Sequence, residues 1–142
     1  MKRNDATVIL TGFAHVLAWV VAIFLVFGPV YQGASVTPVA PGGAVSEPAR
    51  FTQTFIGANG LRVLPFLLWP VALTALALLA ALRTNAGQAR RKVLLWVLAV
   101  LLLGFCAVAI ASIGLLYLPA ALTLLISAVL GLRGRVAETR TG

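Results

Sequence analysis

Acidic residues, histidine and cysteine are all scarce in this sequence. Its 142 residues include three Asp or Glu, one His and one Cys. Paired-carboxylate catalysis, metal-assisted hydrolysis and nucleophilic catalysis each need several such side chains close together, so the usual partners are missing. The lone cysteine, Cys106, excludes an intrachain disulfide and leaves its redox state unassigned. We therefore expect a protein that is not an enzyme and that carries no cofactor or metal.

Charge is also rare. Charged residues make up 10% of the chain and hydrophobic residues 61%, whereas soluble domains are near half apolar and a quarter charged. This composition is typical of an integral membrane protein, for which the lipid bilayer is the first partner.

Four apolar runs are long enough to cross a membrane, since about 20 apolar residues span a hydrocarbon core. They cover residues 6–31, 64–82, 93–112 and 115–132. We expect residues 1–142 to form a single transmembrane domain, an all-α bundle of four antiparallel helices. The third and fourth spans should form a tight hairpin, because little more than Gly114 joins them.

The distribution of Lys and Arg predicts the orientation. Positive residues near span ends stay in the cytoplasm, and nine of them fall on one face of the four-span topology against two, Arg50 and Arg62, on the other. The nine are Lys2, Arg3, Arg83, Arg90, Arg91, Lys92, Arg133, Arg135 and Arg140. Both termini should therefore be cytoplasmic, in a bacterial inner membrane, and the loop 32–63 extracytoplasmic.

The net charge of +8 and the basic N-terminus each have another interpretation. Nucleic-acid binding is not expected, because the cations are spread over short segments beside span ends. A cleavable signal peptide would begin in the same way as the first span, but its apolar region runs only about 7 to 15 residues. A retained helix fits the longer first run better.

Small residues recur at three- and four-residue steps in every span, which favours close helix packing in lipid. The alternative is that Ala and Gly are simply common in membrane helices. The four stripes are Thr11, Ala14, Ala18 and Ala22; Pro70, Thr74, Ala77 and Ala81; Gly104, Ala107 and Ala111; and Ala120, Thr123, Ser127 and Gly131.

His15 is the one weak candidate for a cofactor-binding residue, because an intramembrane histidine is a functional hypothesis by default. It shares a helix face with Ala18 and Trp19, which should point it toward the bundle. We interpret it as a neutral histidine that bonds between helices; contact with haem or a quinone is the alternative. Tyr31, Trp96 and Tyr117 fall near span ends and are typical of interfacial belts.

The outer loop should contain a short helix from Ser46 to Asn59, with Phe51 and Phe55 on one side along the membrane surface. Asn59 and Gly60 then predict a turn into the second span. A partner-docking surface and a plain covered loop are both open interpretations of this segment.

The stretch from Thr54 to Leu64 (TFIGANGLRVL), followed by Pro70, and the stretch from Ser112 to Ala121 (SIGLLYLPAA) resemble an uncharacterised family of small bacterial four-helix integral membrane proteins. The resemblance implies a bacterial inner-membrane location and implies no activity. We expect a noncatalytic accessory, assembly or scaffolding component that contacts a membrane-protein partner or a second copy of itself. A transporter of a small or lipidic molecule, formed by an oligomer, is the alternative.

Overall fold

The fold is dominated by four long apolar helices. The computed structural model describes residues 3–35, 49–83, 88–111 and 113–132. Within these ranges, the four helices long and apolar enough to cross a membrane are α1 (Arg3–Phe27), α3 (Leu64–Leu82), α4 (Gln88–Val108) and α5 (Gly114–Leu132). The prediction of a mostly helical protein with four candidate spans is confirmed, and this architecture is that of a multi-pass membrane protein.

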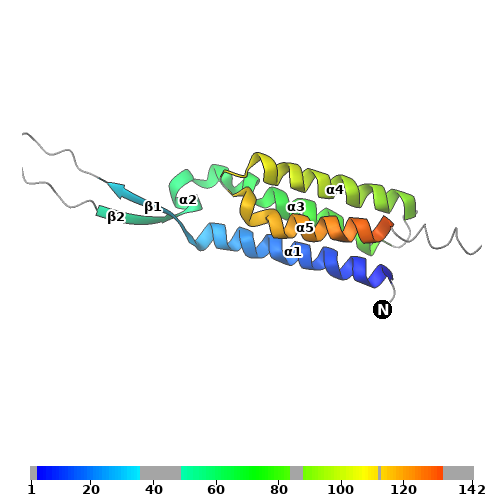
Figure 1. The fold of residues 1–142 in the computed structure, drawn as a ribbon. Coiled ribbons are helices and arrows are strands. Elements are labelled where there is room, and N and C mark those ends of the chain that lie inside the picture. The colour runs from blue at the N-terminus through cyan, green and yellow to red at the C-terminus, as the bar shows by residue number, and fades with distance from the viewer. Residues whose placement is uncertain (1–2, 36–48, 84–87, 112, 133–142) are drawn as a thin grey trace, which may run out of the picture.

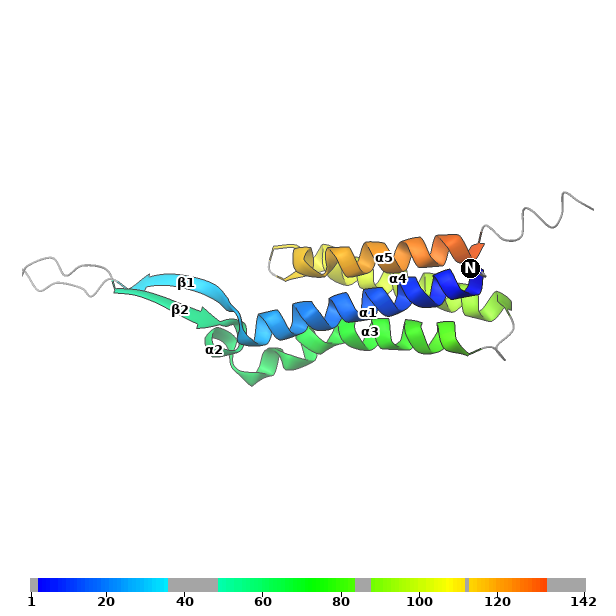
Figure 2. The ribbon, with the colours of Figure 1, turned by 90° about the horizontal axis from the view of Figure 1, so that it is seen from below.

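The helices run antiparallel in one bundle. Helix α1 packs against α3 and α5, and α4 closes the bundle by packing against the same two helices (Figure 1; Figure 2). The start of α1, the end of α3, the start of α4 and the end of α5 lie at one end of the bundle. The chain between α1 and α3 projects from the opposite end.

The first span is shorter than predicted. Helix α1 ends at Phe27, not at Tyr31, because Pro29 lacks an N–H group and restricts the backbone of Gly28 before it. The amide of Gly28 still bonds to the carbonyl of Phe24 at 2.6 Å. The chain then leaves the bundle as an extended strand.

A two-stranded antiparallel sheet replaces much of the expected irregular loop. Strand β1 (Pro29–Ser35) pairs with β2 (Ala49–Thr54), in a register that sets Gly33 opposite Phe51. The predicted helix from Ser46 to Asn59 is therefore wrong over 49–54, and Ser46 lies outside the described residues. The aromatic and β-branched residues of β2 fit a pleated strand, so the all-α prediction misses this small β element.

Only the last residues of that segment are helical. The short helix α2 (Phe55–Asn59) begins after Thr54, whose hydroxyl accepts a hydrogen bond from the amide of Gly57 at 3.0 Å, as an N-cap does. At the predicted turn, Asn59 is the last residue of α2 and Gly60 joins this helix to the next segment with φ +74°, which glycine adopts without steric cost. The 3₁₀ helix η1 (Leu61–Val63) then leads into α3.

The connection between α4 and α5 is longer than Gly114 alone. Helix α4 ends at Val108, and Gly114 is the first residue of α5. The amide of Gly114 bonds to the carbonyl of Ala109 at 2.7 Å. A Cβ atom at Gly114 would overlap the backbone of Cys106 and Ala109, so the corner requires a residue without a side chain.

The predicted small-residue stripes of the first two spans form the centre of the bundle. Thr11, Ala14 and Ala18 in α1 are fully buried, as are Thr74 and Ala77 in α3. In α5 the prediction is right for Ala120 and Ser127, which are buried, whereas Thr123 and Gly131 are only partly covered.

The stripe predicted for the third span is wrong. Gly104, Ala107 and Ala111 are exposed, and α4 instead buries a stripe made of Leu95, Leu98, Ala99, Leu102 and Cys106. Gly104 follows Leu102 by two residues, which is about 200° around a helix. Gly104 and Ala107 therefore lie off the packed face, and Ala111 lies beyond the end of α4.

Candidate functional site

His15 lies between α1 and α3, where both of its ring nitrogens have partners. The indole Nε1 of Trp19 donates to His15 Nε2 at 3.1 Å, and His15 Nδ1 lies 3.0 Å from the Thr74 hydroxyl oxygen. Because an indole N–H can only donate, Nε2 is the acceptor and the neutral ring carries its proton on Nδ1. The histidine therefore donates to Thr74.

Thr74 extends this chain of hydrogen bonds to the backbone of its own helix, α3. Its hydroxyl lies 3.0 Å from the carbonyl oxygen of Pro70 and 2.9 Å from that of Val71, either of which can accept its proton. Pro70 and Thr74 are both buried. The polar groups run from Trp19, which faces outward, to the backbone of α3, and every side-chain donor among them is used.

This geometry defines what His15 can do chemically. A haem iron or a quinone oxygen would have to displace either Trp19 from Nε2 or Thr74 from Nδ1. Trp19 is 44% exposed and lies at the outer side of the histidine, not on the bundle face that the sequence predicted. The neutral, interhelical interpretation of His15 fits these contacts, and its role toward a cofactor stays a prediction.

A second polar contact joins α1 to α5. The hydroxyl oxygens of Thr11 and Ser127 lie 2.9 Å apart, and the Thr7 carbonyl oxygen lies 2.7 Å from the first and 3.2 Å from the second. Thr11 and Ser127 are fully buried. The two hydroxyl protons are shared among these three oxygens, so the contact is satisfied within the bundle.

Tyr117 makes a third contact, which the sequence interpretation missed. It is fully buried rather than interfacial, and its hydroxyl donates to the Leu67 carbonyl of α3 at 2.8 Å. Its ring also meets that of Phe105 edge to face at 6.1 Å. No local pattern pairs the two residues, because 50 residues separate them along the chain; a buried tyrosine hydroxyl does, however, usually find a hydrogen-bond partner.

The remaining candidates do not join these contacts. Thr123 donates to the carbonyl of Pro119 in its own helix at 2.8 Å, and Cys106 is buried between α4 and α5. Across the described ranges, no three His, Cys, Asp or Glu side chains come together as metal ligands.

Two hollows lie beside α4, away from His15. One, of about 320 Å³, is formed where α4 meets α5 near Cys106 and Gly114. The other, of about 250 Å³, lies between α3 and α4 at the opposite end of the bundle. Arg83, Arg90 and Arg91 are among the residues that line it.

The hairpin β1–β2 is attached to the bundle through aromatic residues. Tyr31 stacks on Phe55 with ring centres 5.9 Å apart. Asn59 donates to the Phe55 carbonyl at 3.0 Å and lies 3.5 Å from the Tyr31 hydroxyl. Phe55 is buried, whereas Phe51, farther along the hairpin, is exposed.

Comparison of the chain with protein-family models, with curated proteins and with solved structures finds no match. The stretches that carry the family resemblance map to two corners of the fold. Thr54 to Leu64 covers the end of β2, α2, η1 and the first residue of α3, and Ser112 to Ala121 covers the beginning of α5. The resemblance itself stays a prediction.

Proposed function

We propose that this chain is a noncatalytic accessory or scaffolding protein of the bacterial inner membrane, and that it recognises a membrane-protein partner through the hairpin β1–β2. Both termini face the cytoplasm in this proposal, and the hairpin is extracytoplasmic. The positive-inside rule supports this orientation, since Arg83 follows the end of α3 and Arg90 and Arg91 lie in the first turn of α4, and both helix ends are at the end of the bundle opposite the hairpin (Figure 1; Figure 2).

The observation that carries the proposal is the projection of the hairpin beyond the helices (Figure 1; Figure 2). Among the described residues its sheet has two strands, so each strand keeps one edge without a strand partner. Such edges accept an added strand from another protein. A two-stranded sheet is only marginally stable in water, and pairing with a partner supplies the missing neighbours.

The interior of the bundle favours a scaffold over a transporter. Thr11, Thr74 and Ser127 are fully buried, and their hydroxyls bond to one another, to His15 or to helix carbonyls. A transport path needs polar groups that meet the cargo, and these groups are already paired. Coupled ion transport also lacks intramembrane charges to drive it.

Photocrosslinking in intact cells tests the proposal. A photoreactive residue replacing Thr52 on β2 should give one discrete protein adduct, whereas the same residue replacing Phe13, an exposed position in α1, should react with lipid. Mass spectrometry then identifies the adduct as another protein or as a second copy. Equal adducts from both positions, or none from Thr52, would contradict hairpin recognition.

A flux assay separates the two function classes. Proteoliposomes that contain the purified protein should release entrapped small solutes no faster than empty liposomes. Release that depends on the protein and stops in Thr74→Val would instead favour the transporter. The protein purified from native membranes should also show no visible absorption band, and a band lost in His15→Ala would make the histidine a cofactor ligand.

A further inference from the structure

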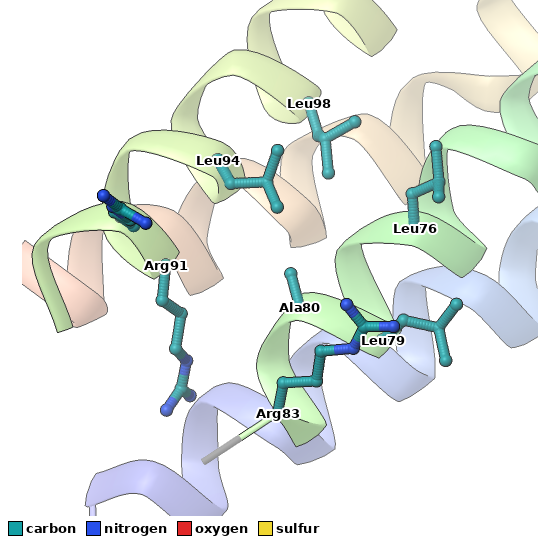
Figure 3. A pocket seen from close by; sticks show the side chains of 8 residues that line it. Leu76, Leu79, Ala80, Arg83, Arg91, Leu94 and Leu98 are labelled. Atoms are coloured by element: carbon teal, nitrogen blue, oxygen red, sulfur yellow. The ribbon is translucent and has the colours of Figure 1, made fainter. Parts of the chain in front are cut away.

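The groove between α3 and α4 combines a cationic end with an apolar floor. It is lined on one side by Leu76, Leu79 and Ala80 of α3 and by Arg83, the residue after this helix, and on the other side by Arg90, Arg91, Leu94 and Leu98 of α4. Figure 3 shows Arg83, next to the end of α3, and Arg91, on α4, at the same end of the groove, with Leu76 and Leu98 farther along it. The groove thus changes from charged to apolar along its length.

The charged end has an excess of positive charge. None of the eight lining residues is acidic, and Arg83 and Arg90 are exposed while Arg91 is partly buried. Arg90 and Arg91 also lie in the first turn of α4, which contains no acidic residue. Helix N-termini carry partial positive charge and favour anions, so these arginines add to a positive potential that an anion would neutralise.

The apolar part of the groove is open at the side of the bundle. Leu79 is 52% exposed and Leu94 is 45% exposed. Both lie within the candidate spans, where the surroundings of the bundle would be lipid. An acyl chain can therefore enter the groove from the side. A free phosphate ion would use the arginines and leave these leucines uncovered, whereas a phospholipid matches both ends with one molecule.

We propose that this groove binds an anionic phospholipid, with its phosphate held by Arg83 and Arg91 and one acyl chain lying against Leu79 and Leu94. Guanidinium groups bind phosphate oxygens through paired charge-assisted hydrogen bonds, and basic pockets between membrane helices bind anionic headgroups. The volume of about 250 Å³ holds part of the lipid, and the rest lies along the outside of the bundle. This site does not depend on the hairpin or its partner.

Native mass spectrometry of delipidated protein in detergent tests the site. Phosphatidylglycerol and phosphatidylcholine with identical acyl chains are titrated in parallel. Phosphatidylglycerol should bind at least about tenfold more tightly, and Arg83→Gln or Arg91→Gln should each weaken it about fivefold, since each surface cation contributes on that scale. The matched control is Arg62→Gln, which removes the same charge from η1 and should leave binding unchanged. Equal binding of the two lipids, or equal loss in the control, would overturn the proposal.

A second pair of variants tests the acyl half of the site and separates a lipid from a free anion. Leu94→Trp fills the groove without changing its charge and should abolish the preference for phosphatidylglycerol, whereas Leu101→Trp, at an exposed α4 position outside the groove, should retain it. Inorganic phosphate in excess should not displace the lipid. Displacement by phosphate together with unchanged binding in Leu94→Trp would identify a simple anion site and overturn the lipid assignment. Unfolding temperatures equal to wild type show that each variant remains folded.

Discussion

Helices α1 and α4 are held in the same bundle by different means. Helix α1 buries Ala14 and Ala18 and forms side-chain hydrogen bonds to α3 through His15 and to α5 through Thr11. Helix α4 buries a stripe of leucines, and among the hydrogen bonds between described side chains none joins it to another helix. The hollow near Cys106 and the one near Arg83 both lie beside α4.

The difference indicates how stability is distributed in a membrane bundle. In lipid the hydrophobic effect does not drive one helix against another, so close backbone approach and interhelical hydrogen bonds decide the association. Helix α1 has both, whereas α4 depends on the dispersion contacts of larger side chains, which leave gaps at its edges. We therefore expect substitutions in α1 and its partners to cost more than equivalent substitutions in α4.

The largest effect is expected from filling the α1 interface. Ala18 is fully buried, so Ala18→Leu should push α1 away from its neighbours and lower the free energy of unfolding by about 3 kcal/mol. Reversible unfolding in mixed micelles, followed by circular dichroism, measures this loss. Ala107→Leu makes the same change at an exposed α4 position and should have almost no effect; similar losses in both variants would abolish the contrast between the helices.

Removing the Tyr117 hydroxyl should have the next largest effect. Tyr117→Phe keeps the ring contact with Phe105 but leaves the Leu67 carbonyl without its partner from α5. The expected loss is about 1–2 kcal/mol of unfolding free energy, measured in the same titration. Tyr31→Phe, in the hairpin, is the control and should leave bundle unfolding unchanged. A wild-type value for Tyr117→Phe would show that this hydrogen bond does not stabilise α5 against α3.

The Thr11 to Ser127 contact should give a smaller, measurable coupling. A double-mutant cycle of Thr11→Val and Ser127→Ala isolates the interaction between the two hydroxyls. The expected coupling is about 0.6 to 1.7 kcal/mol, the range for hydrogen bonds between membrane helices. Pairing Thr11→Val with Thr123→Val should give no coupling, because Thr123 bonds within its own helix. Equal coupling in both cycles would point to an indirect effect.

The smallest effect is expected at the two indoles. The buried Nε1 of Trp96 in α4 has no hydrogen-bond partner among the described residues, so Trp96→Phe should leave stability within about 0.5 kcal/mol of wild type or raise it slightly. Trp19→Phe in α1 removes a bond to His15 and should lower stability by about 0.6 kcal/mol. A larger loss of stability in Trp96→Phe than in Trp19→Phe would contradict the contrast between α1 and α4.

Sequence periodicity was sufficient for the four helices and for the buried stripes of α1 and α3. It failed for α4, because Gly104, Ala107 and Ala111 follow a helical period as regular as that of the leucines that pack. Period alone says which residues share a face and does not say which face meets the neighbours. That choice depends on where α3 and α5 lie.

The hairpin and the polar contacts were harder to predict for a different reason. Strand β2 is recognisable only once β1 is available to pair with it, and 13 residues separate them along the chain. His15 was singled out as a lone ionisable group, but its partner Thr74 is 59 residues away. Pairings between distant residues are fixed by tertiary packing, which no local pattern contains.

A single residue, Gly28, separates the last residue of α1 from the first residue of β1, and β2 continues directly into α2. Tension applied to the hairpin is therefore transmitted to α1 and, through α2 and η1, to α3. The hydrogen bond between His15 and Thr74 joins these two helices to each other, whereas the Thr11 to Ser127 and Tyr117 to Leu67 contacts join them to α5 and lie across the separation that such a pull would produce. Helices α4 and α5 are not directly connected to the hairpin along the chain. A pull on the hairpin would therefore load α1 and α3 before it loads α4 and α5.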